Sequence, residues 1–83
     1  MSDNLYADLG TSQRILKLLK SQKDFGGPQS IEDVCTNLKM TNRNARSILS
    51  KMTIRGEIDR IGQGIYRAKN DEREFDPKKP HYS

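Results

Sequence analysis

Apolar residues recur at helical spacing in three separate segments of the chain. The first segment covers residues 11–22 and places three apolar residues on one helical face: Ile15, Leu18 and Leu19. The other two repeat the spacing i, i+3, i+4 and i+7, with Ile31, Val34, Cys35 and Leu38 in one and Ala45, Ile48, Leu49 and Met52 in the other. Three amphipathic helices are therefore predicted, each with one buried stripe.

The first predicted helix has a capping residue before it and helix breakers after it. Thr11 or Ser12 would cap its amino terminus, since each offers a side-chain oxygen to the first backbone N–H groups. Residues 23–28 end in Gly-Gly-Pro, which disfavours helical geometry. A loop is therefore expected between the first two helices.

The second and third helices also carry start signals. Ser30 and Asp33 form a near match to a capping box, with Asp in place of the usual Glu or Gln. Thr41 would cap the third helix, and Gly56 would end it, because glycine readily adopts the left-handed conformation. The third helix is thus expected over residues 41–55, a few residues after the second.

Beyond Gly56 the apolar period changes from helical spacing to two, which predicts a β-hairpin over residues 57–69. Its tip would be the three residues Gly62, Gln63 and Gly64. A symmetric tip of that length would place four cross-strand pairs face to face, namely Ile61 with Ile65, Arg60 with Tyr66, Asp59 with Arg67 and Ile58 with Ala68. A register slipped by one residue is the alternative.

The length of 83 residues allows one core and one domain. We expect a domain over residues 11–69 and a mobile polar tail over residues 70–83, which has mixed charge and little apolar periodicity. In residues 1–10, Leu5, Tyr6 and Leu9 could form one apolar turn that docks on the domain or on a second copy. A homodimer would compensate for the small core.

Positive charge is concentrated in the second half of the predicted domain. The whole chain carries a formal charge of +4, whereas residues 41–69 contain seven basic and two acidic residues, a net charge of +5. Residues 41–55 contain no acid, although a solvated helix usually mixes charges of both signs. This distribution favours an anionic partner.

Catalytic and metal-binding patterns find little support. Cys35 lies in a core stripe and His81 lies in the tail, and no acidic pair or phosphate-binding glycine loop is evident. We therefore expect no enzyme activity, no cofactor, no metal and no small-molecule ligand. The single cysteine and the lack of a long apolar run favour a cytoplasmic protein, or a nuclear one in a eukaryote, without membrane contact.

Three helices followed by a hairpin is the order of winged helix-turn-helix domains, and three motifs strengthen the resemblance. Residues 41–52 (TNRNARSILSKM) resemble the recognition helix of bacterial and archaeal winged-helix regulators. Residues 55–60 (RGEIDR) and 62–66 (GQGIY) are similar to that family's helix exit and wing. The resemblance covers residues 11–69 and implies an α+β, mostly α fold with a three-helix helix-turn-helix core and a two-stranded hairpin wing.

The resemblance and the helical geometry together predict a site on double-stranded DNA. With the apolar stripe inward, the third helix presents a polar face to the major groove, while the wing contacts the backbone or minor groove. The predicted DNA-binding residues are Asn42, Arg43, Asn44, Arg46, Ser47, Ser50, Lys51, Arg60, Gln63, Arg67 and Lys69. The alternatives are a merely solvated helix face, and a hairpin that Arg60 and Arg67 only brace. Tyr66 is expected to anchor the wing to the core.

The function predicted from these residues is sequence-specific DNA binding, as in a small transcriptional regulator. The alternative from another class is a winged-helix module that binds proteins within a larger assembly. Charge separates the two, since an assembly module does not need a recognition helix without acids.

Overall fold

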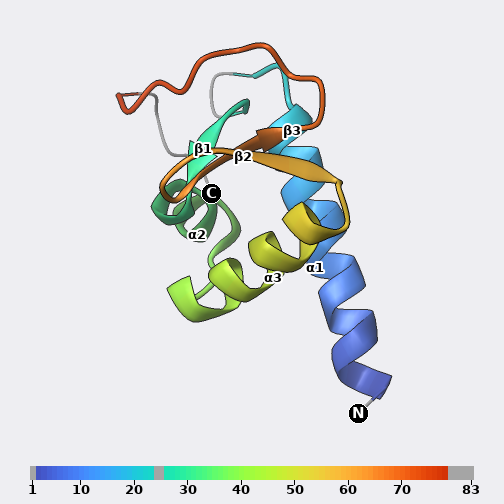
Figure 1. The fold of residues 1–83 in the computed structure, drawn as a ribbon. Helices are drawn as coiled ribbons and strands as arrows, with labels where there is room; N and C mark the ends of the chain where they lie inside the picture. The colour runs from blue at the N-terminus through green and yellow to red at the C-terminus, as the bar shows by residue number, and fades with distance from the viewer. Residues whose placement is uncertain (1, 24–25, 79–83) are drawn as a thin grey trace.

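The protein is described here from a computed structural model that covers residues 2–23 and 26–78, with the backbone alone over residues 2–9. The described elements, in chain order, are α1 (Ser2–Lys20), β1 (Gln29–Ser30), α2 (Ile31–Leu38), α3 (Asn42–Ile54), β2 (Ile58–Gly62) and β3 (Ile65–Ala68). The three strands form one antiparallel sheet in the order β1-β3-β2 (Figure 1). The α+β, mostly α class is confirmed, and about half of the chain is helical.

Helix α1 begins at Ser2 and not near Thr11, so the predicted cap at Thr11 or Ser12 is wrong. A single glycine inside a helix costs only about 1 kcal/mol, so Gly10 does not stop the helix. Ser12 is buried, and its hydroxyl accepts a hydrogen bond of 3.2 Å from the Arg55 guanidinium. The amino-terminal end of α1 extends beyond the other elements (Figure 1). The side chains of Leu5, Tyr6 and Leu9 lie outside the described part, so their docking stays a prediction.

The starts of α2 and α3 follow the predicted capping chemistry. The backbone N–H of Asp33 donates to the Ser30 hydroxyl at 3.1 Å, and the Ser30 N–H donates to the Asp33 carboxylate at 3.2 Å, which completes the capping box. Thr41 caps α3 by accepting the Asn44 N–H at 3.2 Å. Gly56 follows the end of α3 with a φ of 80°, as predicted.

The sheet has one strand that the sequence did not predict. Gln29 and Ser30 form β1 and pair with Tyr66 and Ile65 of β3, so the hairpin is part of a three-stranded sheet. The side chain of Gln29 is buried and accepts a hydrogen bond of 3.1 Å from the Asn37 amide. A strand of two residues has no periodicity to detect, and this one depends on partners distant in sequence. The two expected strands are present as β2 and β3, but the sheet that contains them has a third strand.

The hairpin register is confirmed except at its tip. Ile58, Asp59 and Arg60 face Ala68, Arg67 and Tyr66 as predicted, but Gly62, not Ile61, faces Ile65. The turn is formed by Gln63 and Gly64, and Gly64 has a φ of 71°. Because a two-residue turn suits the twist of a hairpin, β2 contains one extra residue, and Ile61 lies at a bulge with 40% of its surface exposed.

The core lies between the three helices and the inner face of the sheet. The buried apolar residues of the predicted stripes are Ile15, Leu18, Leu19, Val34, Ala45, Ile48, Leu49 and Met52, and the sheet adds Ile58, Tyr66 and Ala68. Tyr66 is 8% exposed, which confirms that it anchors the hairpin to the core. Cys35 packs against this core, and burial raises the pKa of its thiol.

The segment after β3 is attached to the domain through Arg73. Its guanidinium donates to the carbonyl of Ser21 at 2.7 Å and of Leu19 at 3.2 Å, next to the carboxyl end of α1. It also forms an ion pair of 2.9 Å with Asp71. Arg73, within the predicted tail, therefore contacts the domain. The predicted mobility of residues 79–83 concerns a segment outside the described residues.

Candidate nucleic-acid interface

Every polar residue that the sequence placed on the outer face of α3 is exposed. The apolar residues Ala45, Ile48, Leu49 and Met52 point into the core. The exposed polar residues on the remaining surface are Asn42, Arg43, Asn44, Arg46, Ser47, Ser50 and Lys51. Because none of them is acidic, α3 presents a positively charged surface rich in hydrogen-bonding groups.

Two hollows divide this surface into a ridge and two flanks. At 100° per residue, Arg43 and Ser50 point away from the core and form the ridge. Asn44, Ser47 and Lys51 follow one another on one side of it, and we call this side the α1-side flank. The other flank carries Asn42 and Arg46 and faces the hairpin.

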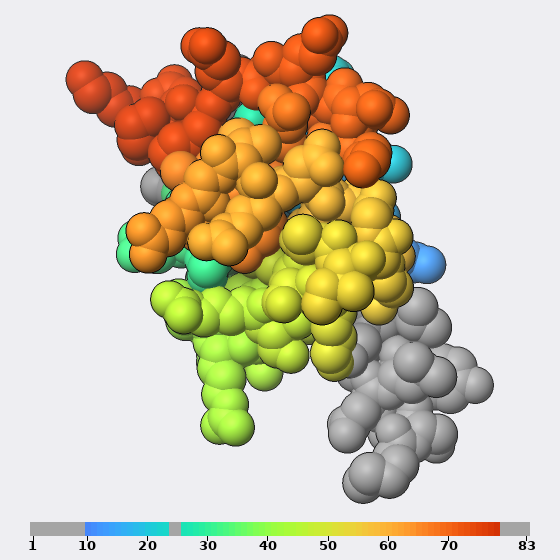
Figure 2. Space-filling model, in the orientation of Figure 1, coloured from blue at the N-terminus to red at the C-terminus, as the bar shows by residue number. Residues whose placement is uncertain are grey.

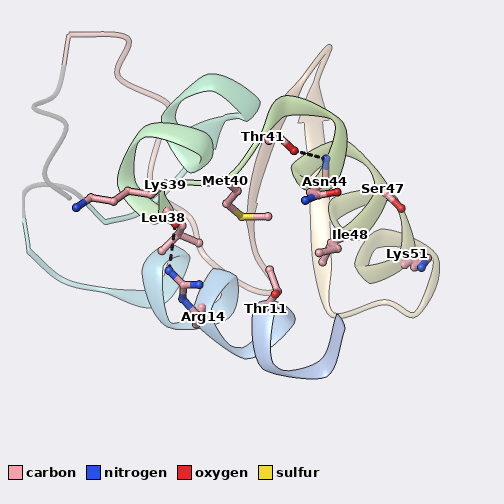
Figure 3. A pocket seen from close by; sticks show the side chains of 10 residues that line it. All are labelled: Thr11, Arg14, Leu38, Lys39, Met40, Thr41, Asn44, Ser47, Ile48 and Lys51. Atoms are coloured by element: carbon pink, nitrogen blue, oxygen red, sulfur yellow. Dashed lines mark hydrogen bonds between the residues drawn. The ribbon is translucent and has the colours of Figure 1, made fainter. Parts of the chain in front are cut away.

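The hollow on the first flank, which we call the α1-side hollow, has a volume of about 560 Å³. Its other lining residues come from α1 and from the turn between α2 and α3: Thr11, Arg14, Leu38, Lys39, Met40 and Thr41. Figure 3 shows Lys51 at one end of this hollow and Arg14 toward the other, while the Lys39 side chain extends outward beyond Leu38. The Arg14 guanidinium donates to the Leu38 carbonyl at 3.1 Å.

The second hollow, which we call the wing-side hollow, has a volume of about 860 Å³. It brings Asn42 and Arg46 of α3 together with Arg60 and Gln63 of the hairpin, above Tyr66. Figure 2 shows α3 and the hairpin exposed next to each other on one face of the molecule. The remaining lining includes two acidic residues of α2 and two residues of the carboxy-terminal segment, namely Glu32, Asp33, Phe75 and Pro77.

The basic residues of the hairpin lie on both faces of it. Arg60 is opposite Tyr66 and shares the wing-side hollow with Arg46, and its Nε donates to the Gly62 carbonyl at 3.2 Å, which braces the bulge. Arg67 and Lys69 alternate with the buried residues of β3 and therefore lie on the solvent face.

Asp59 accompanies the two cations on the solvent face of the hairpin. The Lys69 ammonium lies 3.5 Å from the Asp59 carboxylate, and the Arg67 guanidinium lies 4.0 Å from it. These ion pairs fit the prediction that Arg67 braces the hairpin. The structure thus brings Arg60 and Gln63 to the surface of α3, but not Arg67 and Lys69.

Sequence reasoning missed three residues near this surface. Arg14 and Lys39 line the α1-side hollow from outside α3, and no local pattern predicts that they lie beside the same surface. Ile54, at the end of α3, is 83% exposed. A signal for Ile54 was present, because helical spacing places it on the same face of α3 as Arg43 and Ser50.

Metal-binding and membrane-spanning features are absent from the described residues. In the part of the chain that the structure describes, no three His, Cys, Asp or Glu side chains gather into a group that could hold a metal ion. Across the same part, no helix combines the length and apolar character needed to span a membrane.

The fold and this surface define a small α+β domain with a basic helix exposed beside a hairpin. No protein-family model, curated protein or solved structure matches the chain significantly.

Proposed function

We propose that the protein binds double-stranded DNA, with α3 in the major groove and the β2–β3 hairpin beside the phosphate backbone. The observation that carries the proposal is the exposed face of α3, which holds three cations and no acid. Apart from the short strand β1, the described order of three helices followed by a hairpin is also that of winged helix-turn-helix domains. A chain of 83 residues with such a surface suits a small transcriptional regulator.

The ridge and flanks of α3 suggest how the readout is divided. Arg43 and Ser47 lie in the amino-terminal half of α3 and would reach base edges, since arginine pairs well with guanine in the major groove. Arg46 and Arg60 share the wing-side hollow and would contact phosphate groups, which position the protein without reading sequence. Base recognition therefore belongs to Arg43 on the ridge and to Ser47 beside it.

A second candidate function is a protein-binding module within a larger assembly. Ile54, with 83% of its surface exposed, favours it, because an apolar side chain on the ridge could contact a protein partner. The exposed Ile61 at the hairpin bulge adds a second apolar contact. Weak dependence of partner binding on salt would distinguish this function from DNA binding.

The decisive experiment is selection of bound sequences from random duplex DNA, followed by two substitutions. Arg43→Ala should cost about 1 to 3 kcal/mol on the selected site and much less on random DNA, because it removes a contact to a base. Arg60→Ala should weaken binding to both DNAs by a similar factor, because it removes a phosphate contact. Fluorescence anisotropy titrations on the two duplexes measure both effects.

Lys69→Ala is the matched control in the same hairpin. Its ammonium lies on the solvent face beside Asp59, so we expect a smaller loss than for Arg60→Ala. Thermal unfolding should change little in all three variants, since none of the side chains is in the core. An equal and uniform loss from Arg43→Ala and Arg60→Ala on both DNAs would show that α3 does not read the bases.

A further inference from the structure

We infer that the α1-side hollow is a second phosphate-binding surface, which holds the DNA strand on the side of the major groove away from the hairpin. Arg14, Lys39 and Lys51 would supply its positive charge. The inference rests on the proposed function and extends it to residues outside α3 and the hairpin.

The chemistry of the lining separates this hollow from the one beside the hairpin. Its three cations come from three different segments, α1, the α2–α3 turn and α3, which meet only in the folded protein. Among the described residues that line it, none is acidic, and the polar ones are Thr11, Thr41, Asn44 and Ser47. The wing-side hollow, in contrast, also contains Glu32 and Asp33. An anion is therefore better accommodated on the α1 side.

The position of the hollow fits the shape of the major groove, which has a phosphate backbone along each of its two edges. Asn44, Ser47 and Lys51 lie on one flank of α3, and Asn42 and Arg46 lie on the other. A helix inserted with its ridge toward the bases would therefore turn one flank to each backbone. If the flank with Asn42 and Arg46 contacts one DNA strand, the α1-side hollow contacts the other DNA strand.

Arg14 is held in place for such a contact. One of its terminal nitrogens donates to the Leu38 carbonyl at 3.1 Å, at the carboxyl end of α2. A guanidinium has five N–H donors, so this bond leaves others for a phosphate. Lys51 lies at the far end of the hollow (Figure 3). Phosphate charges follow one another closely along a strand, so the two ends can contact different phosphates.

One positive charge of the hollow can be removed by substituting Lys39 without straining the backbone. It adopts the left-handed conformation with a φ of 55°, which glycine adopts more readily than lysine. Lys39→Gly therefore removes one cation while keeping the turn. The matched control is Lys20→Ala, which removes an exposed cation of α1 that lines neither hollow.

The first test is the salt dependence of binding to the selected duplex. Lys39→Gly and Arg14→Gln should each weaken binding about threefold to tenfold and reduce the magnitude of the log–log salt slope by about one. Lys20→Ala should leave the affinity within about twofold of the parent protein. Circular dichroism and thermal unfolding verify that each variant is folded. If Arg14→Gln does not fold, Lys39→Gly alone tests the inference.

The second test maps the contacted phosphates by ethylation interference. The parent protein should give two groups of sensitive phosphates, one on each strand. With Arg60→Ala, ethylation of one group of phosphates should no longer interfere with binding. With Lys39→Gly, ethylation of the other group should no longer interfere. If both variants lose the same group, or if Lys39→Gly behaves like Lys20→Ala, the inference is wrong while the proposed function stands. If the parent protein binds no duplex even at low salt, the proposed function fails, and the inference fails with it.

Discussion

Arg73 shows how one side chain can attach a polar segment to a small core. Its guanidinium spans the carbonyls of Leu19 and Ser21, which lie at or just beyond the last turn of α1, where backbone acceptors are left without helical partners. The Asp71 carboxylate fixes the same guanidinium through its Nε and a terminal nitrogen. A cation at this end of a helix also interacts favourably with the helix dipole. The attachment therefore stabilises the fold beyond the predicted domain boundary at residue 69.

The first prediction concerns the pH dependence of this attachment. Hydrogen bonding to the Arg73 side chain holds the pKa of Asp71 below its ordinary value, against the opposing effect of burial. A carboxyl whose pKa is lower in the folded state stabilises the protein above its unfolded pKa, about 3.9, and this stabilisation is lost as pH falls through the folded value. Asp71→Asn should thus lower the free energy of unfolding by about 1 to 2 kcal/mol at neutral pH.

Urea unfolding measured between neutral pH and strongly acidic pH tests this prediction. Below the folded pKa the difference between the parent protein and Asp71→Asn should shrink, because the parent carboxyl is then protonated as well. Glu74→Gln, which changes an exposed carboxyl in the same segment, is the control and should show no such convergence. A constant difference across the acidic range would contradict the role assigned to Asp71.

At the scale of elements, α1 combines two regions with different surroundings. Its carboxy-terminal half packs against the core through Ile15, Leu18 and Leu19. Its amino-terminal end extends beyond the other elements (Figure 1). A helical segment of so few residues is marginally stable in water without a partner. The sequence places Leu5, Tyr6 and Leu9 in that segment, which is the composition expected of a contact with a second copy.

The second prediction is that deletion of residues 1–10 converts a dimer into a monomer. The full chain should show the mass of two copies in multi-angle light scattering, and the shortened chain that of one. The shortened chain should remain folded, because the described core residues of α1 all lie beyond Gly10. A monomeric full chain, or an unchanged mass after the deletion, would place no dimer contact in this segment.

For the whole molecule, the distribution of charge matters more than its total. The net charge of +5 over residues 41–69 exceeds the +4 of the entire chain, and the fold gathers much of it on α3 and the neighbouring hairpin. Such a concentration attracts a polyanion over distances comparable to the Debye length, about 8 Å at physiological salt. Binding should consequently be fast and sensitive to ionic strength.

The third prediction gives this sensitivity a value. We expect about four to six phosphate contacts per domain, and thus a slope of about −4 to −5 in a plot of the logarithm of affinity against the logarithm of salt concentration. Titrations of a labelled duplex at several salt concentrations measure it. A slope near zero would favour the protein-binding module instead of DNA binding.

The sequence by itself determined the features that depend on neighbours within a few residues. The apolar stripes at i, i+3, i+4 and i+7 located α2 and α3, because a helix that packs on a core has apolar residues along one face. The caps at Ser30 and Thr41 followed from side chains that bond to backbone groups three residues away. The period of two gave the register of the hairpin as far as Arg60. The outward face of α3 followed from the same helical period.

Only the tertiary structure decided which distant residues meet. The strand β1 exists because Gln29 and Ser30 pair with β3, some 35 residues later in the chain. The contacts of Arg14 with Leu38 and of Arg73 with Leu19 and Ser21 likewise join segments without a shared local pattern. The division of the basic residues between the two faces of the hairpin and the two flanks of α3 arose in the same way. The sequence gives the number of charged residues, whereas the packing of the elements determines the direction in which each charged side chain points.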